Sequence, residues 1–343
     1  MNVRLRIWLQ GLGATTQLLN DSVMQPTEDL LVGGQAVLEG VMMRSPHSFA
    51  IAVHRTPEEV AVRKEPVPRV SEKYPLFKWP VLRGVGILGQ AFVLGMKAIK
   101  FSADQLMEAF DQEEARKAAP STSTAEPPKK GGELGPWFIA VNAIVATVLF
   151  IFLFKFLPLS VATYFQNHTQ WAKSRIPFNL VDGVVRLALF VGYIGGLGLW
   201  KEFHRLYEYH GAEHKVVFNF ESQKPLTVEN ARGFSTLHPR CGTSFLLTVM
   251  LISIVVYCFI PFQSFALKLL FRILLLPVVM GLSYEIIRYA AKKPGSLFAI
   301  MTKPGLWLQR ITTQPPDDAQ LATGIRALEE ALSLEPTYSA PQG

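Results

Sequence analysis

A group of histidines offers the clearest chemistry in the sequence. His210 and His214 lie four residues apart in the segment YEYHGAEHK, so on a helix their side chains would share one face and could reach a single cation. With Glu213 between them, the segment matches the pattern H-x-x-E-H, in which two histidines bind zinc and the glutamate is the general base. The spacing predicts a zinc site with hydrolase-like chemistry.

A catalytic zinc site needs a third protein ligand and an open fourth position for water. The segment LHPRCGTSF offers His238 and Cys241 at H-x-x-C spacing, and Glu221 and Glu285 are carboxylate alternatives. One thiolate and three imidazoles could instead fill all four positions and form a closed structural site. The sequence also leaves open a histidine cluster that binds no metal and only makes hydrogen bonds or faces lipid.

Four other polar residues are weaker candidates. Glu285 and Arg288 are three residues apart and are expected to form a structural ion pair, although a carboxylate inside a membrane is a functional candidate by default. Glu39 and Arg44 lie in the segment GGQAVLEGVMMR. They could line a pocket with the His-rich segment or belong to a surface β-turn.

Long apolar segments organise the rest of the chain. The 343 residues are 49% apolar and 18% charged, with a mean hydropathy of +0.23, which is typical of a membrane protein. Because a spanning helix needs roughly 20 mostly apolar residues, we expect an α-helical membrane protein with about four transmembrane helices. The expected spans are 137–161, 178–200, 245–260 and 267–289. Asp182 and Arg186, four residues apart in the second span, are expected to pair.

The basic residues predict an orientation. Residues 200–244 contain six lysines and arginines, whereas residues 261–266 contain none. The positive-inside rule therefore predicts that both termini and the His-rich segment lie on the cytoplasmic side of a bacterial inner membrane. Membrane lipid is the expected partner. Nucleic-acid binding is not expected, because no basic stripe is interleaved with aromatic residues.

The N-terminal part has a different character. After an extension at 1–30 without a signal-peptide pattern, residues 31–78 alternate short apolar runs with glycine and proline. Period-two alternation at 50–55 and 60–63 predicts strands joined by a turn at 56–58. The sequence therefore predicts a small β-rich cytoplasmic unit.

Residues 79–101 are long enough to cross a membrane but carry Arg83, Gln90, Lys97 and Lys100. These polar side chains favour an interfacial or re-entrant helix over a fifth span. If the segment did span, the N-terminus would lie outside.

Residues 102–135 are polar and rich in proline, serine, threonine and glycine, so they are expected to form a linker. The remaining units are a first hairpin at 136–200, a His-rich loop at 201–244, a second hairpin at 245–290 and a cytoplasmic tail at 291–343. Within the tail, Leu321, Ile325, Leu328 and Leu332 recur at helical spacing after Asp317 and Asp318. This pattern predicts a capped docking helix.

Six segments resemble the YqhQ-like bacterial membrane proteins. They are GGQAVLEGVMMRSP (33–46), LRG (82–84), HGAEHK (210–215), LTVENAR (226–232), LHPRCGTSFLL (237–247) and YEIIR (284–288). The resemblance covers about residues 31–312; the linker at 110–135 and the extension before residue 31 depart from it. It implies a polytopic membrane protein from a family of unknown function, for which metal-dependent enzyme activity has been predicted.

Two hypotheses follow from these observations. The leading one is a zinc-dependent, hydrolase-like site with His210, His214 and either His238 or Cys241 as ligands and Glu213 as the base. The competing one is a non-enzymatic membrane assembly, scaffold or transport-associated protein whose metal site is structural.

Overall fold

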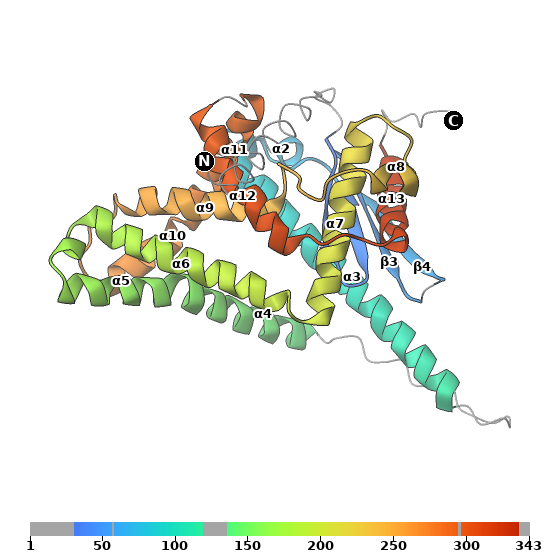
Figure 1. The fold of residues 1–343 in the computed structure, drawn as a ribbon, viewed down its shortest axis with the longest axis horizontal. Helices are drawn as coiled ribbons and strands as arrows, with labels where there is room; N and C mark the ends of the chain where they lie inside the picture. Colours follow the sequence, from blue (N-terminus) through green and yellow to red (C-terminus); the bar gives the residue numbers. More distant parts are fainter. Residues whose placement is uncertain (1–30, 57, 119–135, 294–295, 336–343) are drawn as a thin grey trace, which may run out of the picture.

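The computed structural model describes residues 31–56, 58–118, 136–293 and 296–335. A small sheet with helices on both faces forms one end of the molecule, and a bundle of apolar helices extends from it (Figure 1). The extension at 1–30 and residues 119–135 of the expected linker lie outside the described residues.

The sheet is a four-stranded antiparallel meander in the order β1-β2-β3-β4. Its strands are β1 (Gly33–Val37), β2 (Gly40–Arg44), β3 (Ser48–His54) and β4 (Val60–Pro66). The strands expected at 50–55 and 60–63 are confirmed, since Ile51 pairs with Arg63 and Val53 with Ala61.

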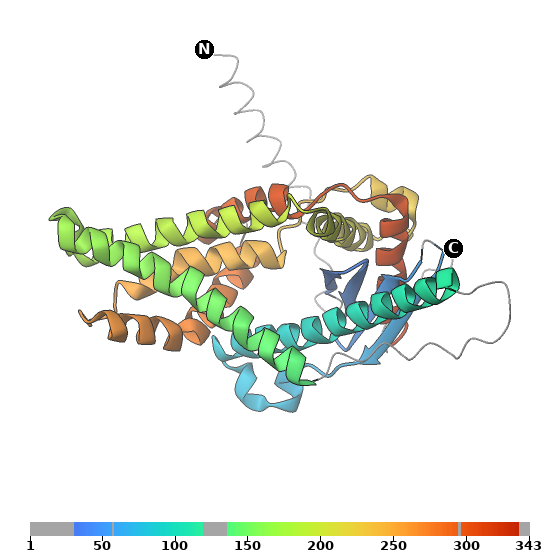
Figure 2. The ribbon, with the colours of Figure 1, turned by 90° about the horizontal axis from the view of Figure 1, so that it is seen from below.

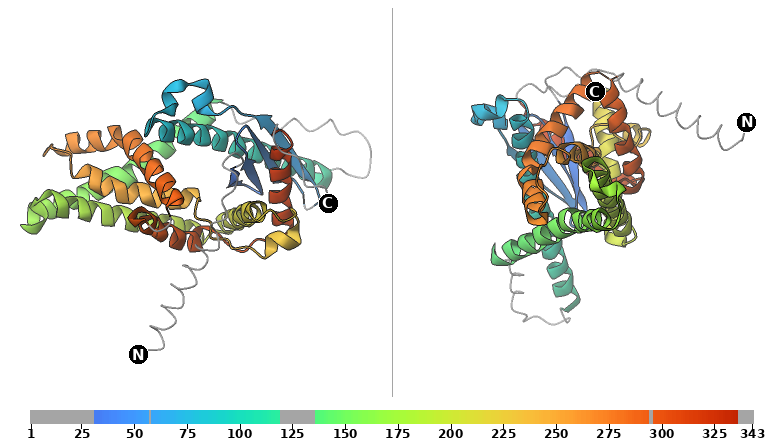
Figure 3. Two further views of the ribbon diagram at one scale, coloured as in Figure 1. Left: turned by 90° about the horizontal axis from the view of Figure 1, so that it is seen from above. Right: turned by 90° about the vertical axis from the view of Figure 1, so that its left-hand side faces the viewer.

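Both faces of the sheet are covered (Figures 2 and 3). Phe49 and Ile51 of β3 pack against Leu94 and Ala98 of α3 (Leu82–Ala118). Ala52, one position along, faces the opposite side, where α7 (Lys201–Glu221) and α13 (Asp318–Leu332) pack. Burial on both faces explains why β3 is almost continuously apolar rather than alternating with polar residues.

The segment 201–244, expected as a loop, is largely helical. It contains α7 and the short helix α8 (Val228–Arg232), which Thr227 caps by accepting a hydrogen bond from the Asn230 N–H. Tyr209, Ala212 and Val216 are fully buried on one face of α7. Packing of this face against the sheet and α13 stabilises a helix whose composition is otherwise polar.

Helix α13 confirms the expected docking helix. Asp317 is its N-cap and forms a capping box with Gln320, satisfying backbone N–H groups that a helix start leaves unpaired. The four expected apolar residues are buried against α7 and the sheet: Leu321, Ile325, Leu328 and Leu332.

The bundle is built from apolar helices. They are α4 (Pro136–Ile151), the π-helical stretch η2 (Phe152–Phe156), α5 (Leu157–His168), α6 (Arg175–Leu197), α9 (Gly242–Tyr257), α10 (Phe265–Leu274), α11 (Leu276–Lys292) and α12 (Leu297–Thr312). Short helices occur at α2 (Val70–Lys73), η1 (Pro75–Lys78) and η3 (Trp171–Lys173).

Within the described residues, three helices are long and apolar enough to cross a membrane: Leu82–Arg116, Val141–His168 and Arg175–Leu197. The expected span at 267–289 is instead the pair α10 and α11, bent by 48°, which gives a fourth crossing if the pair is one broken span. The expected span at 245–260 corresponds to α9, a shorter apolar helix of 16 residues. These helices are compatible with a multi-pass membrane protein.

Helix α3 differs from the expected boundaries. It continues through Ala118, so residues 102–118 are helical rather than part of a linker. One side of α3 packs on the sheet, whereas Phe92, Val93 and Ile99 on its other side are exposed. This two-sided character agrees with an interfacial helix, although its length and composition would also allow it to span.

Candidate metal centre

Two histidines and one cysteine meet where α7 approaches the start of α9. His210 and His214 lie one turn apart on α7, and Cys241 is the N-cap residue of α9. The nitrogen and sulfur atoms that these three side chains offer lie within 4.8 Å of one another. Imidazole and thiolate are ligands that suit zinc and similar transition metals.

The hydrogen bonds of the two imidazoles determine which ring nitrogens face the centre. Nδ1 of His210 lies 2.7 Å from the carbonyl oxygen of Thr312, and Nδ1 of His214 contacts the carbonyl oxygen of Thr236. Because a carbonyl can only accept, each Nδ1 carries the proton and donates. The Nε2 lone pairs are therefore available, and metal-binding histidines are commonly held in this way.

These Nε2 atoms and the thiol face one another. Nε2 of His210 lies 3.2 Å from Sγ of Cys241. Nε2 of His214 is buried and has no hydrogen-bond partner among the described residues. Burial also lowers the pKa of His214, which favours the neutral imidazole that a metal requires.

The start of α9 positions the sulfur. The Thr243 N–H donates to Sγ of Cys241 over 3.4 Å, and Oγ1 of Thr243 lies 3.2 Å from the same sulfur. These contacts hold the sulfur at the start of α9, 3.2 Å from Nε2 of His210.

His238 lies beside this group rather than within it. Its ring centroid is 5.7 Å from that of His214. The Arg240 N–H donates to its Nδ1 over 3.3 Å, so Nε2 carries the proton and faces Oε2 of Glu221 at 3.4 Å. Burial lowers the pKa of His238 to about 4. Of the two candidates for a third ligand, Cys241 is therefore the better placed.

Glu213 is buried next to the same centre. Its Oε2 lies 3.4 Å from Nε2 of His214. Burial raises the pKa of Glu213, against the opposing effect of His210 and His238 nearby, and the Gly34 N–H donates to its carboxylate. A carboxylate in this position could contact a metal-bound water or the metal itself.

Gly34 brings β1 against Glu213. A Cβ at this position would lie 2.8 Å from Cγ of Glu213 and 2.5 Å from the carbonyl oxygen of Met42. Only glycine allows this approach. The motif at 33–46 therefore reaches the candidate centre through a glycine, which no local pattern marked as a site residue.

Three of the weaker candidates lie elsewhere. Arg44 donates to Gln90 of α3 over 2.5 Å. Glu285 on α11 accepts two hydrogen bonds from Arg83 of α3, one of them 2.6 Å long. Among the described residues the ion pair of Glu285 is with Arg83, about 200 positions away, and Arg288, the expected partner, acts on Glu285 through its charge alone.

Two carboxylates border α7: Glu39, the fourth of the weaker candidates, and Glu221, one of the alternative ligands. Glu39 occupies the turn between β1 and β2 with φ of 51°, and its carboxylate accepts from Nε of Arg205 over 2.5 Å. Glu221, at the end of α7, pairs with Arg240 and faces His238. Both help to fix α7 but do not belong to the group of three.

Some residues that orient the candidate ligands carry no sequence signal. Thr236 and Thr312 act through backbone carbonyls, which any residue type could supply. Gln309 on α12 holds the backbone of His238 on both sides: its Oε1 accepts from the His238 N–H at 2.7 Å, and its Nε2 donates to the His238 carbonyl at 2.8 Å.

Comparison with known proteins identifies the family. Residues 79–334 match the family model described as "Protein of unknown function (DUF1385)". The chain is 32% identical over 313 residues to the uncharacterized protein YqhQ of Bacillus subtilis (strain 168). The aligned region covers 88% of this chain and 92% of that protein. No solved structure gives a significant match. The YqhQ-like resemblance is therefore confirmed, and the chain belongs to the DUF1385 family of proteins of unknown function.

Proposed function

We propose that this protein is a multi-pass membrane enzyme with a zinc-dependent, hydrolase-like site, in which His210, His214 and Cys241 bind the metal. One observation carries the proposal. The buried Nε2 of His214 forms no hydrogen bond in the described part of the chain, although a second imidazole, a thiol and Oε2 of Glu213, 3.4 Å away, surround it. Leaving a buried polar atom unpaired costs about 1–3 kcal/mol, and a bound cation would remove that cost.

Glu213 is proposed as the general base. Three protein ligands leave a fourth position for water, and zinc in such a site supplies a Lewis acid and lowers the pKa of that water. The carboxylate of Glu213 lies next to the proposed ligands, where it would act as the base if a metal held a water there. The backbone of Gly34 lies against the same side chain.

A structural role for the same metal is the second candidate. The three proposed ligands connect α7 to α9, and His210 also contacts the end of α12. A metal there would fasten the sheet-containing unit to the bundle. In that case the protein would be a non-enzymatic assembly, scaffold or transport-associated protein.

We further propose that the protein resides in a bacterial inner membrane, in contact with lipid, with both termini and α7 in the cytoplasm. The apolar helices and the concentration of basic residues at 200–244 support this orientation. The proposed active site would then lie at the cytoplasmic end of the bundle.

Metal content tests the shared part of both proposals. Protein purified in detergent without chelator should contain about one zinc per chain, and His214→Ala should lose it. His204→Ala is a matched control on the same helix, because His204 is half exposed and lies 3.7 Å from Glu208. Equal metal content in wild type and His214→Ala would contradict both proposals.

A further inference from the structure

A second group of charged side chains is buried inside the bundle. Four members are basic, Lys155, Arg186, Lys268 and Arg272, and one is acidic, Asp182. None is more than 8% exposed. Charges in membrane-spanning helices are costly and usually serve a function. This group therefore requires an explanation that the proposed metal centre does not provide.

The single carboxylate does not balance the cations. Asp182 accepts hydrogen bonds from both Arg186 and Arg272, and Arg272 also donates to Oδ1 of Asn179 over 2.7 Å. The Nε atoms of both arginines are buried without a hydrogen-bond partner in the described part of the chain. Donor capacity and positive charge are therefore both in excess.

Aromatic rings contribute to this environment without adding a negative charge. The guanidinium of Arg272 lies 4.9 Å from the ring centre of Tyr257, and Nζ of Lys155 donates to the Tyr257 hydroxyl over 2.8 Å. Lys155 lies in the π-helical stretch η2, a type of irregularity that is frequent at functional sites. Cation–π contacts stabilise the cations only in part.

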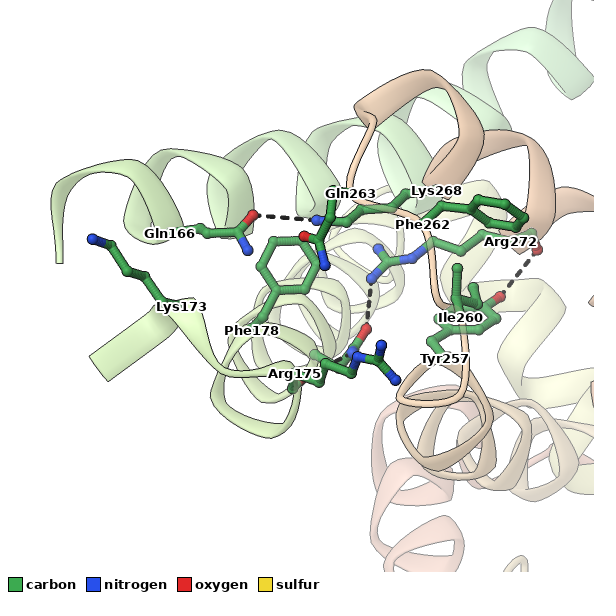
Figure 4. A pocket seen from close by; sticks show the side chains of 11 residues that line it. Gln166, Lys173, Arg175, Phe178, Tyr257, Ile260, Phe262, Gln263, Lys268 and Arg272 are labelled. Atoms are coloured by element: carbon green, nitrogen blue, oxygen red, sulfur yellow. Dashed lines mark hydrogen bonds between the residues drawn. The ribbon is translucent and has the colours of Figure 1, made fainter. Parts of the chain in front are cut away.

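The basic group is continuous with a pocket, shown in Figure 4. The pocket lies between the turns that join α5 to α6 and α9 to α10, at the end of the bundle farthest from α7 (Figure 1). Its basic lining residues are Lys173, Arg175, Lys268 and Arg272. No lining residue is acidic.

The pocket is small. Its cavity volume is about 30 Å³, which is room for a water-sized group. Nζ of Lys268 lies 3.2 Å from Oε1 of Gln166 and 4.1 Å from the ring centre of Phe178. A single oxygen of a larger anion could enter here while the rest remained at the mouth, near Arg175.

We propose that this pocket binds an oxyanion of the phosphate type, with Lys268 and Arg272 contacting one oxygen and Lys173 and Arg175 at the mouth. Arginine side chains match phosphate oxygens in geometry and charge. The same chemistry is presented by free phosphate and by the headgroup of an anionic lipid. The site is independent of the proposed metal centre.

The test uses the full-length protein in a neutral detergent. Thermal unfolding is followed while sodium phosphate is added, with sodium chloride at equal ionic strength as the control salt. In a parallel series phosphatidylglycerol is added, with phosphatidylcholine as the control lipid. We expect at least one of the two phosphate-bearing anions to stabilise the wild type more than its control compound does. Stabilisation by phosphatidylglycerol alone would assign a lipid headgroup, and stabilisation by inorganic phosphate would assign a free oxyanion.

Variants locate the binding. Lys268→Gln should raise the concentration for half-maximal stabilisation about tenfold or more, since a charge-assisted hydrogen bond is lost. Arg175→Gln, at an exposed position, should also raise the concentration for half-maximal stabilisation. This variant provides the test if Lys268→Gln folds poorly. Lys201→Gln, an exposed site on α7, controls for the lost charge and should leave it unchanged. The proposal would be overturned if neither anion stabilised the protein more than its control compound. It would also be overturned if wild type and Arg175→Gln needed the same anion concentration for half-maximal stabilisation.

Discussion

Acidification should destabilise the protein through His238. Burial lowers its folded-state pKa to about 4, whereas an exposed histidine in the unfolded chain has a pKa of about 6.5. Between these values the unfolded chain binds more protons than the folded one, so the free energy of unfolding falls as the pH falls. Well above pH 6.5 His238 is neutral in both states, so its titration does not change the free energy of unfolding.

The expected size follows from the two pKa values. Each unit of difference corresponds to about 1.4 kcal/mol, so the complete loss well below pH 4 would be about 3.5 kcal/mol. Between pH 7.5 and pH 5 the loss from His238 should be about 2 kcal/mol. Other titrating groups contribute to the total, so only the difference between variants isolates this residue.

Thermal unfolding of chelator-treated protein at pH 7.5 and pH 5 measures the effect. His238→Gln keeps a donor that can face Glu221 but cannot titrate, so it should lose about 2 kcal/mol less than the wild type over this interval. His204→Gln removes an exposed histidine and should follow the wild type. If His238→Gln lost as much stability as the wild type, the assignment of His238 as a buried neutral group would be refuted.

Three further predictions concern the proposed base, the orientation and the packing. Glu213→Gln should retain metal and expression level yet fail to complement a strain that lacks the gene, because an amide cannot act as a base; full complementation would favour the structural role. Single cysteines at Thr169 and Gln263 should react with an impermeant thiol reagent added to intact cells, and a cysteine at Ser222 should not; labelling at Ser222 would reverse the orientation. Leu328→Ala should lower the free energy of unfolding by about 2–5 kcal/mol, since Leu328 is fully buried, whereas the exposed Leu199→Ala should change thermal unfolding little.

Local sequence patterns predicted the elements that depend on local interactions. Helix α13 begins directly after its N-cap Asp317 because the cap and the apolar spacing are encoded within a few residues. The strands β3 and β4 follow from alternation and a turn. The spacing of His210 and His214 likewise suffices to place both on one face of a helix.

Features that depend on distant contacts could not be predicted in this way. Helix α7 has a polar composition, and its helical form relies on the sheet and α13 burying one face. Whether His238 or Cys241 approaches the two histidines depends on the path of the chain into α9. The contact between Gly34 and Glu213 joins residues about 180 positions apart, and no local pattern encodes it.

Metal analysis of the purified protein tests the central claim most directly. Zinc content would be measured by inductively coupled plasma mass spectrometry in the wild type, in His210→Ala, His214→Ala and Cys241→Ser, and in the control His204→Ala. The proposed ligand set predicts about one zinc per chain in the wild type and the control, and clearly less in the other three variants. Wild-type protein prepared without chelator that contained no transition metal would contradict it.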